Sequence, residues 1–487
     1  MSAFSVLTDD QIRELLENLT VDELEEFRAE LKAALHQYST GTQAPDESSV
    51  NQPERTSIHS AETGATTLFM PSCSPAGHGV KVVTLSSAES HDTAAAETDG
   101  APAVIRPTGA ITLFSPQGQP VGILHASTLT AFRTALASMC LVQKRETVRT
   151  ISVFGSGEQA YWHVRLTLML RGSTIKQVHI INRRFSPYLK DFMRRLYAVP
   201  AATKIREGWG ECTFGVLTPT YGEYHRLLEN QLQSSDIIFC CTPSTKPLFD
   251  ASILTGHDGR PKGRLIVAIG SYTPNMHELP VEILHQATKV HSHHHFFHRH
   301  ALEGGVVVVD TLDGALKEAG ELIEAELQPK QLVELGELVM LQNASMTKDP
   351  DTLASDISSN LSSTASLPTS ELEKLQLGSF NGSGSAMSSV FSSSGEQRSS
   401  SRSRAESPRR KSGSGSSSPH RRHSFDRRAS DDRHKKQKQK DDHLAQWLCA
   451  GNVIYKSVGL GLMDLTVGMH VIRFAREKGV GTHVEGF

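Results

Sequence analysis

The sequence predicts an α/β protein in which a doubly wound sheet accompanies an α+β domain and a long disordered insertion. From residue 151 onward, short continuous apolar runs alternate with helical patterns, which is typical of parallel strands buried on both faces. Between residues 66 and 129 the β-rich runs follow one another directly, separated by Gly, Pro and Ser. Residues 343–442 are rich in Ser, Arg and Lys and poor in apolar side chains, so burial cannot offset the entropy of ordering them.

Composition excludes several classes of protein. A chain of 487 residues is long enough for two domains, but 38% hydrophobic residues is low for a chain folded throughout. The net charge of -3 argues against binding nucleic acid with the whole surface. No apolar run approaches the roughly 18 residues of a membrane helix, and the acidic N-terminus is unlike a signal peptide. Six sparse cysteines favour reduced thiols, so we expect a cytoplasmic protein. From the charge and the apolar runs we expect neither membrane nor nucleic-acid partners.

The first 145 residues predict helices, then strands, then a further helix. Apolar residues recur at helical spacing over residues 9–38, and Thr20 with Glu23 forms a capping-box pair that divides this stretch into two helices. Four β-rich runs follow, and a GQP turn at residues 118–120 joins the last two as a hairpin. Residues 89–98 form a polar insertion between these runs, and a helix is expected over residues 128–145.

The strands of the parallel sheet are predicted from short runs rich in apolar residues, most of which end at Gly, Asn, Thr or Asp. In order, these runs are VRTISVFG, IKQVHIIN, CTFGVL, DIIFCCT, RLIVAIG and VVVVD. After the insertion, order resumes at residue 443, and a helical pattern through Leu465, Val471 and Phe474 ends at Gly479.

A glycine motif, GSGEQA at residues 155–160, follows the strand TISVF and opens a helix. Gly155 would permit a tight turn, Gly157 would let the backbone approach a pyrophosphate, and Ala160 would allow close helix–strand packing. The helix N-terminus would stabilise the phosphate charge. The motif therefore predicts a Rossmann-type dinucleotide-binding domain, and the alternative is a glycine turn without a nucleotide.

The end of the second strand indicates which nucleotide is bound. A carboxylate there would accept hydrogen bonds from the ribose of NAD, but this strand ends in Asn182, Arg183 and Arg184. Two guanidinium groups offer forked donors and permanent charge to a 2′-phosphate. NADP(H) is therefore favoured over NAD(H), the alternative being that both arginines are merely solvated.

Several segments, in order along the chain, resemble motifs of the ornithine cyclodeaminase/mu-crystallin family. The resemblance covers roughly residues 1–343 and 443–487. The segments are QPERT at 52–56, FMP at 69–71, GVKVV at 79–83, LTAFRTA at 129–135, CTPSTKP at 241–247, VAIG at 267–270, LGEL at 335–338, YKSVG at 455–459 and DL at 464–465.

The resemblance implies an architecture and a set of roles. Residues 1–145 would form a substrate-binding and dimerisation domain with the C-terminal segment 443–487 packed back on it, and residues 146–342 would form the Rossmann domain. Arg55 and Lys81 would bind the substrate carboxylate, with Val458 lining the same pocket. The implied cofactor contacts are Arg133, Glu158 and Gln159 at the phosphates, Asn182, Arg183 and Arg184 at the adenosine ribose, and Thr242 and Ser457 from later strands.

The chain departs from the family's cyclodeaminases at one position. These enzymes place a catalytic Asp just after the VAIG strand, where this chain has Tyr272, and Met276 replaces a lysine further on. A phenol with a pKa near 10 is a poor base at neutral pH, which argues against ornithine deamination. Ketimine reductases of the family also lack this Asp. Tyr272 could then donate a proton to the substrate nitrogen, or merely fill the rim of the pocket.

These observations favour an NAD(P)H-dependent imine or ketimine reductase that acts on a small amino-acid-derived substrate as a homodimer. The alternatives are an ornithine cyclodeaminase, which forms proline and ammonia, and a non-catalytic NADP(H)-dependent binding protein.

Two further features lie outside the family pattern. Six histidines fall within residues 291–300, a density that could bind Zn²⁺, although an exposed loop is the simpler interpretation and we expect no metal. In the basic insertion, Ser424 and Ser430 follow paired arginines and resemble sites of a basophilic kinase.

Overall fold

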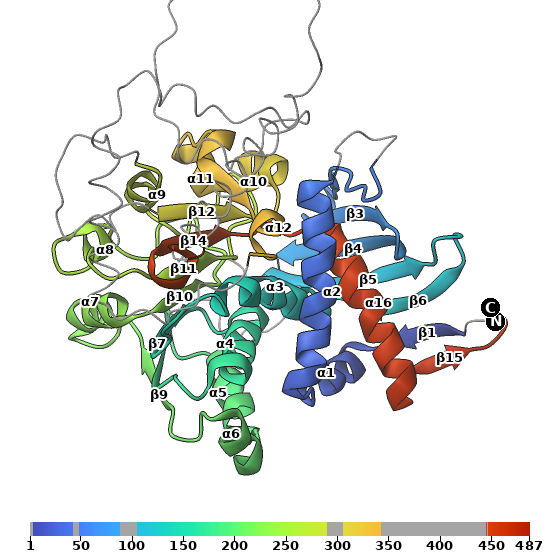
Figure 1. Cartoon of the computed structure of the whole chain (residues 1–487), viewed down its shortest axis with the longest axis horizontal. Coiled ribbons are helices and arrows are strands. Elements are labelled where there is room, and N and C mark those ends of the chain that lie inside the picture. The colour runs from blue at the N-terminus through green and yellow to red at the C-terminus, as the bar shows by residue number, and fades with distance from the viewer. Residues whose placement is uncertain (1–2, 42–47, 88–104, 290–304, 342–444, 446) are drawn as a thin grey trace, which may run out of the picture.

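The computed structural model describes residues 3–41, 48–87, 105–289, 305–341, 445 and 447–487. These residues form two sheets with their helices, arranged as two adjoining parts (Figure 1). The predicted α/β fold with a doubly wound parallel sheet is confirmed. The polar insertion at 89–98, the histidine tract at 291–300, the segment 343–442 and its Ser424 and Ser430 lie outside the described residues.

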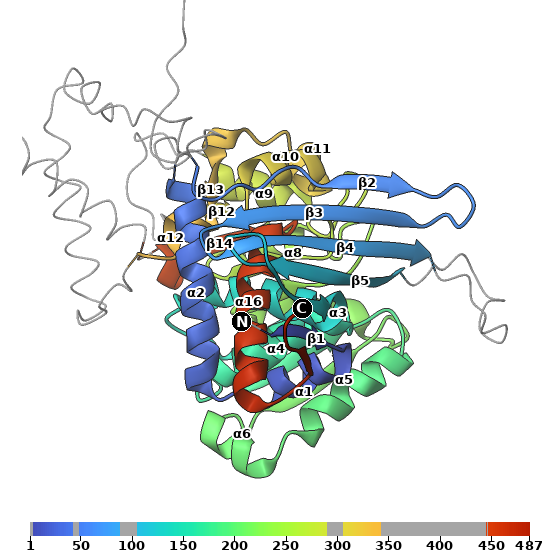
Figure 2. The same cartoon turned by 90° about the vertical axis from the view of Figure 1, so that its right-hand side faces the viewer.

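Within the described residues, seven strands form the first sheet, in the order β15-β1-β6-β5-β4-β3-β2. Strands β2 to β6 form an antiparallel meander, as the predicted hairpin at residues 118–120 requires, and Figure 2 shows β2 to β5 side by side. β1 joins parallel to β6, and β15 pairs with β1, which brings the two ends of the chain together. The strands are β1 (Phe4–Leu7), β2 (Thr56–His59), β3 (Thr66–Ser74), β4 (Gly77–Ser87), β5 (Ile105–Phe114), β6 (Pro120–His125) and β15 (Thr482–Val484).

Four helices pack on this sheet or beside it: α1 (Asp9–Glu17), α2 (Val21–Thr40), α3 (Ala126–Val142) and α16 (Gly461–Lys478). The predicted break at Thr20 is confirmed, because its side chain accepts a hydrogen bond from the Glu23 backbone in a capping box. α16 lies against β3, β4 and β5 and is flanked by α2 (Figure 2). Its predicted end at Gly479 is also confirmed, since that residue adopts a φ of 67°.

Eight parallel strands form the second sheet within the described residues, in the order β13-β12-β14-β11-β10-β7-β8-β9. The continuous apolar runs account for this burial, since every residue of β10 and β11 is buried. The strands are β7 (Thr150–Phe154), β8 (Gln177–Ile181), β9 (Thr213–Leu217), β10 (Ile237–Cys240), β11 (Leu265–Ala268), β12 (Gly305–Val309), β13 (Leu332–Glu334) and β14 (Asn452–Lys456).

Helices cover both faces of this second sheet. Val153 and Phe239 on one face share a core with residues of α3, α4 and α5, whereas Phe154 and Ile238 on the other face pack with α7 to α11. The helices are α4 (Glu158–Arg171), α5 (Pro187–Ala198), α6 (Ala201–Glu207), α7 (Tyr224–Ser234), α8 (Ser252–Thr255), α9 (Val281–Thr288), α10 (Leu312–Glu318), α11 (Gly320–Glu324), the 3₁₀ turn η1 (Pro329–Gln331) and α12 (Leu335–Leu338).

The C-terminal segment is divided between the two sheets. β14 lies inside the parallel sheet, paired with β11 and β12, and only α16 and β15 pack with the first sheet (Figure 1). The expectation that residues 443–487 pack back on the first domain therefore needs correction for β14. The apolar run NVIY has no polar alternation, and such a run is buried on both faces of a parallel sheet.

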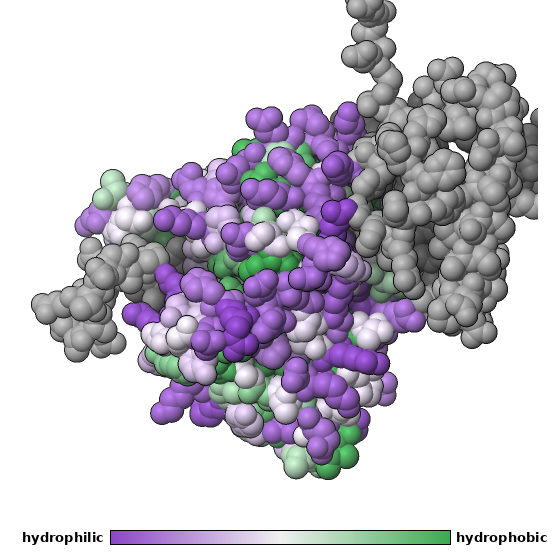
Figure 3. All heavy atoms as spheres, turned by 90° about the vertical axis from the view of Figure 1, so that its left-hand side faces the viewer, coloured by the Kyte–Doolittle hydropathy of each residue, from purple (hydrophilic) through white to green (hydrophobic). Residues whose placement is uncertain are grey.

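The face formed by the second sheet and its helices is mainly hydrophilic, with smaller hydrophobic areas (Figure 3). Among the helices of the described residues, none is long and apolar enough to cross a membrane.

Candidate active site

The glycine turn lies where the sequence predicts it, between β7 and α4. Gly155 has a φ of 97°, and a Cβ at this position would lie 2.8 Å from the carbonyl oxygen of Cys241, so only glycine fits. Gly157 is the N-cap of α4, and a Cβ there would meet nothing within 4 Å. No side chain caps this helix, which leaves its first N–H groups available to an anion.

Two polar atoms in the first turn of α4 are buried and have no hydrogen-bond partner in the described part of the chain. They are Oε2 of Glu158 and Oε1 of Gln159. The other oxygen of Glu158 lies 2.6 Å from Arg195. Buried polar atoms without partners are costly, so their presence beside an open glycine backbone fits a turn built to hold a polar ligand such as a dinucleotide.

The end of β8 lies beside this turn. Asn182 donates hydrogen bonds to the Ser156 hydroxyl at 3.3 Å and to the carbonyl of Arg184 at 2.9 Å, which connects the strand end to the glycine turn. Arg183 and Arg184 are exposed. Neither guanidinium forms an ion pair with the residues that the structure describes, so both are available to a ligand.

Lys81 of β4 and Arg133 of α3 share one buried carboxylate on α16. The Lys81 ammonium lies 2.7 Å from Oδ2 of Asp464, and Nε of Arg133 donates to Oδ1 at 3.0 Å. Burial lowers the pKa of Lys81 to about 8, although Asp464 acts in the opposite direction. Two cations against one carboxylate leave a buried positive charge, which an anionic group would neutralise.

Arg133 was expected at the cofactor phosphates. Its guanidinium lies beside Gly459, where a Cβ would lie 2.9 Å from Nη2, and donates to the sulfur of Met463 at 3.4 Å. Arg133 therefore lies at the segment that leads from β14 to α16. No hydrogen bond joins it to the glycine turn within the described residues.

Arg55 meets Tyr272 across the boundary between the two sheets. Nη2 of Arg55 donates to the carbonyl oxygen of Tyr272 at 2.9 Å and also forms an ion pair with Glu318 on α10. Beside it, Glu54 pairs with Lys317 on the same helix. Burial raises the pKa of the Tyr272 phenol above its usual value of 10, so this side chain keeps its proton at neutral pH.

Arg55 also belongs to the same charged region as Lys81. Its positive charge is one of the influences that lower the pKa of Lys81, together with burial and Arg133. The residues that the family resemblance assigns to a substrate carboxylate are thus brought together from separate strands and loops. Val458 is 8% exposed and follows the end of β14.

Thr242 and Ser457 direct their hydroxyl groups at buried carboxylates. Thr242 donates to Glu278 at 3.0 Å, and Ser457 donates to Asp310 at 2.8 Å. Asp310 also accepts hydrogen bonds from the backbone of Gly459 at 2.6 Å. Both hydroxyls therefore order the carboxyl ends of the parallel strands, where ligands of doubly wound sheets bind.

Sequence reasoning missed the acidic residues of this region. Asp310 ends the run VVVVD, so its place at a strand end was a usable signal. Glu278 and Glu321 lie in a loop and a short helix without a recognisable motif. Lys456 precedes the predicted Ser457, yet nothing in the sequence shows that its ammonium lies 3.3 Å from Glu321 with both side chains buried.

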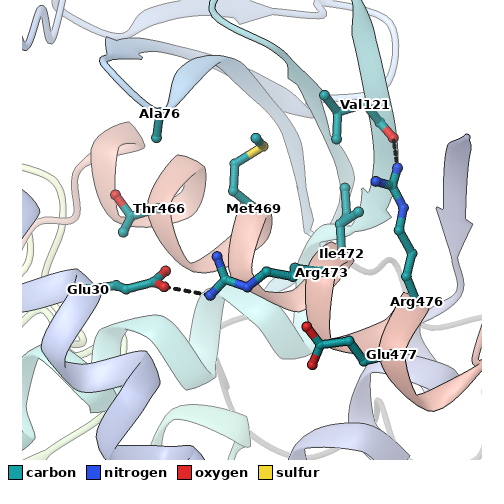
Figure 4. Close-up of a pocket in the computed structure, with 9 residues that line it drawn as sticks. All are labelled: Glu30, Ala76, Val121, Thr466, Met469, Ile472, Arg473, Arg476 and Glu477. Atoms are coloured by element: carbon teal, nitrogen blue, oxygen red, sulfur yellow. Dashed lines mark hydrogen bonds and ion pairs between the residues drawn. The ribbon is translucent and has the colours of Figure 1, made fainter. Parts of the chain in front are cut away.

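A separate pocket of about 480 Å³ lies on α16, and its lining includes none of the predicted site residues (Figure 4). Glu30 of α2 and Arg473 form an ion pair of 2.5 Å at its edge, and Arg476 donates to the carbonyl of Val121 at 3.2 Å. The lining residues are Glu30, Ala76, Val121, Thr466, Met469, Ile472, Arg473, Arg476 and Glu477. We assign no chemistry to this pocket. Elsewhere in the described residues, no group of three or more His, Cys, Asp and Glu is placed to hold a metal ion.

Comparison with known sequences identifies relatives of this chain. The sequence model of the ornithine cyclodeaminase/mu-crystallin family matches residues 10–207. An uncharacterised protein of Saccharomyces cerevisiae is 26% identical over 363 residues, which cover 70% of this chain and 87% of the relative. A Delta(1)-pyrroline-2-carboxylate reductase of Bacillus cereus is 28% identical over 275 residues, which cover 55% of this chain and 68% of the relative.

Solved structures share the fold over nearly the whole chain. The Thermococcus litoralis Delta(1)-pyrroline-2-carboxylate reductase in complex with NADH and L-proline has a TM-score of 0.56 at 17% identity, covering 99% of this chain and 100% of that structure. An archaeal alanine dehydrogenase dimer with bound NAD has a TM-score of 0.55 at 17% identity, covering 100% of both chains. By its sequence motifs, the match over residues 10–207 and its fold, the chain is similar to the ornithine cyclodeaminase/mu-crystallin family.

Proposed function

We propose that this protein is an NAD(P)H-dependent imine or ketimine reductase that acts on a small amino-acid-derived substrate. The observation that supports this proposal is the contact between Arg55 and the carbonyl of Tyr272, at 2.9 Å. The contact brings a cation suited to a substrate carboxylate to the turn that carries Tyr272, the residue that replaces the catalytic Asp of the family's cyclodeaminases. The relatives named as Delta(1)-pyrroline-2-carboxylate reductases act on a compound of this class.

The charges of the site suit an anionic substrate. Arg55, Lys81 and Arg133 provide three cations, and their partners Asp464 and Glu318 provide two carboxylates. A substrate carboxylate would balance the remaining positive charge. The fork of Arg55 and the point charge of Lys81 would then hold the carboxylate and fix the direction of the adjoining carbon, with Val458 against the apolar part of the substrate.

The residues around the glycine turn fit a dinucleotide. A bound nicotinamide dinucleotide would supply the hydride for the reduction. Gly155, Gly157 and Ala160 would hold its pyrophosphate together with Glu158 and Gln159. The other implied contacts are Arg133, Thr242 and Ser457. Because Arg183 and Arg184 are exposed beside Asn182, we expect NADP(H) to be preferred, although the solved relatives carry NADH and NAD.

Tyr272 would act as a proton donor in this reaction. Its pKa is raised by burial, so the phenol is protonated at neutral pH and can donate to the substrate nitrogen. For the same reason it cannot replace an Asp that must accept a proton. This property favours reduction of an imine over deamination of an amine.

One observation favours ornithine cyclodeaminase as a second candidate. Glu318 lies beside Arg55, and burial raises the pKa of its carboxyl group, which makes it a better proton acceptor. Glu318 could therefore take the role of the missing Asp. Release of ammonia and proline from ornithine, without net consumption of a nicotinamide cofactor, would identify this activity.

We infer a homodimer and a location in the cytoplasm by extension from the family. The archaeal alanine dehydrogenase is described as a dimer. Sedimentation of the purified full-length chain would measure the oligomeric state directly, and a monomer at assay concentration would contradict the inferred homodimer.

The first experiment titrates the purified protein with NADPH and with NADH, followed by fluorescence. NADPH should bind at least about tenfold more tightly, equivalent to roughly 1.4 kcal/mol. The difference should disappear in Arg183→Ala/Arg184→Ala, with Arg194→Ala on the exposed side of α5 as the control. Oxidation of NADPH by cyclic imino acids then measures turnover. Binding without turnover of any imine or amino acid would point to a binding protein, and no binding of either nucleotide would contradict both enzyme proposals.

A further inference from the structure

Four buried polar side chains surround the turn that leads into Tyr272. Ser271, Glu278, Glu321 and Lys456 are each 0% exposed. They come from the loop after β11, from α11 and from the end of β14. Burial of three ionisable groups is costly unless their partners are well placed, so the contacts among them are informative.

Glu278 joins the ends of two neighbouring strands. Its Oε1 accepts hydrogen bonds from the backbone N–H of Thr242 at 2.7 Å and from the Thr242 hydroxyl at 3.0 Å. Its Oε2 accepts from the N–H groups of Gly270 at 2.7 Å and Ser271 at 3.3 Å. Thr242 follows β10 and Gly270 follows β11, so a single carboxylate fixes both turns.

The same turn is held from its other side. The Ser271 hydroxyl donates to Glu321 at 2.6 Å. The Lys456 ammonium donates to the carbonyl and hydroxyl oxygens of Ser271 and lies 3.3 Å from Glu321. A Cβ on Gly270 would lie 1.9 Å from the Thr242 carbonyl, so the two turns are in direct contact. The backbone before Tyr272 is therefore fixed by groups from three elements.

We propose that Glu278 is a positioning residue, which sets the arrangement of the cofactor contact Thr242 relative to the proton donor Tyr272 by holding their two turns together. This inference rests on the proposed function for the roles of those two residues. Glu278 acts through the turns and not on the substrate, because both of its oxygens are already engaged by donors of the chain. Small displacements of such groups lower the rate of catalysis strongly.

The protonation of Glu278 should control this arrangement. Burial raises its pKa to about 7, and the ammonium of Lys456 opposes that effect. The other titratable groups that face it are Glu321 on α11 and the thiols of Cys240 and Cys241, whose own pKa values are raised by burial. A protonated Glu278 would carry an O–H group that faces the N–H groups of the chain and cannot accept their hydrogen bonds. One of the two turns would then be released. Activity should therefore fall as the pH falls through about 7.

The test compares Glu278→Gln with Glu282→Gln in the full-length chain. Glu282 is exposed on α9 and provides the same chemical change outside the network. Hydrogen–deuterium exchange is measured for peptides that contain residues 242–244 and 270–272, above the pKa of Glu278. The affinity for NADPH, and kcat and KM for a cyclic imino acid across the pH range, are measured for the same proteins.

In Glu278→Gln we expect faster exchange in those two segments, a kcat about 10- to 100-fold lower with a smaller change in KM, and loss of the decline near pH 7. A merely structural role would not remove that decline. Exchange and a pH profile equal to those of the wild type would overturn the proposal. If the wild type reduces no imino acid, the proposed function fails, and the inference is then decided by exchange and NADPH affinity, which must both change in Glu278→Gln.

A second variant covers the case in which Glu278→Gln does not fold. Ser271→Ala removes the hydroxyl shared by Lys456 and Glu321 without altering any charge. Exchange should quicken at residues 270–272 more than at 242–244, and kcat should fall. Unchanged exchange in Ser271→Ala would overturn the view that this network fixes the turn before Tyr272.

Discussion

Lys81 combines a buried position with a charge that the proposed substrate needs. Its side chain is 4% exposed, and its ammonium is compensated by Asp464, which Arg133 shares. Burial lowers its pKa to about 8, so Lys81 is protonated at neutral pH and loses its charge in mildly alkaline solution. The titration of Lys81 should therefore be visible in the pH dependence of substrate binding.

We predict that KM for a carboxylate-bearing imine rises in the wild type as the pH rises through about 8, because the neutral amine no longer attracts the carboxylate. In Lys81→Arg the charge persists at alkaline pH, so KM should be higher throughout but lose this rise. Steady-state kinetics over the alkaline range measures both effects, with Lys190→Arg on the exposed side of α5 as the control. A rise that persists in Lys81→Arg would assign the titration to another group.

At the scale of single residues, the sequence suggested cations for the proposed site but not the carboxylates that they contact. Arg55 and Lys81 were found because they lie in motifs that resemble those of a family. Asp464 was part of such a motif without a role, and Glu278 and Glu318 gave no signal at all. The reason is physical: these carboxylates act by meeting groups more than thirty residues away or on neighbouring strand ends, and such contacts exist only after the sheet has formed.

The two glycines of the turn between β7 and α4 have different roles. Gly155 has a φ of 97° and no space for a Cβ, whereas Gly157 has a φ of -83° and open space around the Cβ position. The first glycine is thus required by the fold. The second is required only if a ligand approaches its backbone.

We therefore expect two alanine substitutions in this turn to differ, one acting mainly on stability and the other mainly on NADPH binding. Gly155→Ala should lower the free energy of unfolding by about 1–3 kcal/mol, because the backbone is strained and Cys241 is too close. Gly157→Ala should cost less than about 1 kcal/mol, yet it should weaken NADPH binding by about tenfold or more, since the methyl group would occupy the place of the pyrophosphate. Urea unfolding and NADPH titration measure the two quantities. Unaltered NADPH affinity in Gly157→Ala would argue against a pyrophosphate at this turn.

Helices and strands were largely predictable, but the order of the strands was not. Continuous apolar runs identified the parallel strands, since burial on both faces leaves no polar alternation. β14 was missed as a member of the sheet because it follows the long insertion, and its partners β11 and β12 precede that insertion. The pattern of a strand shows that it is buried, whereas its neighbours are set by the path of the whole chain.

Across the whole molecule, the two sheets are joined by contacts of different kinds. α12 lies directly on α2, where a Cβ on Gly336 would be 2.0 Å from the carbonyl of Leu35. Near the proposed substrate site, two ion pairs connect α10 with the segment before β2: Arg55 with Glu318, and Lys317 with Glu54. They lie side by side but differ strongly in exposure, which makes them a natural comparison.

Their exposure predicts that only one of these ion pairs contributes to stability. The side chains of Arg55 and Glu318 are 16% and 23% exposed, whereas those of Lys317 and Glu54 are 58% and 79% exposed. Glu318→Ala would leave a largely buried guanidinium without its carboxylate and should lower the free energy of unfolding by about 1–3 kcal/mol. Glu54→Ala should have no measurable effect, because solvent screens the exposed pair. Urea unfolding of both variants measures the difference, and equal losses would mean that burial of Arg55 does not govern how α10 is held to the segment before β2.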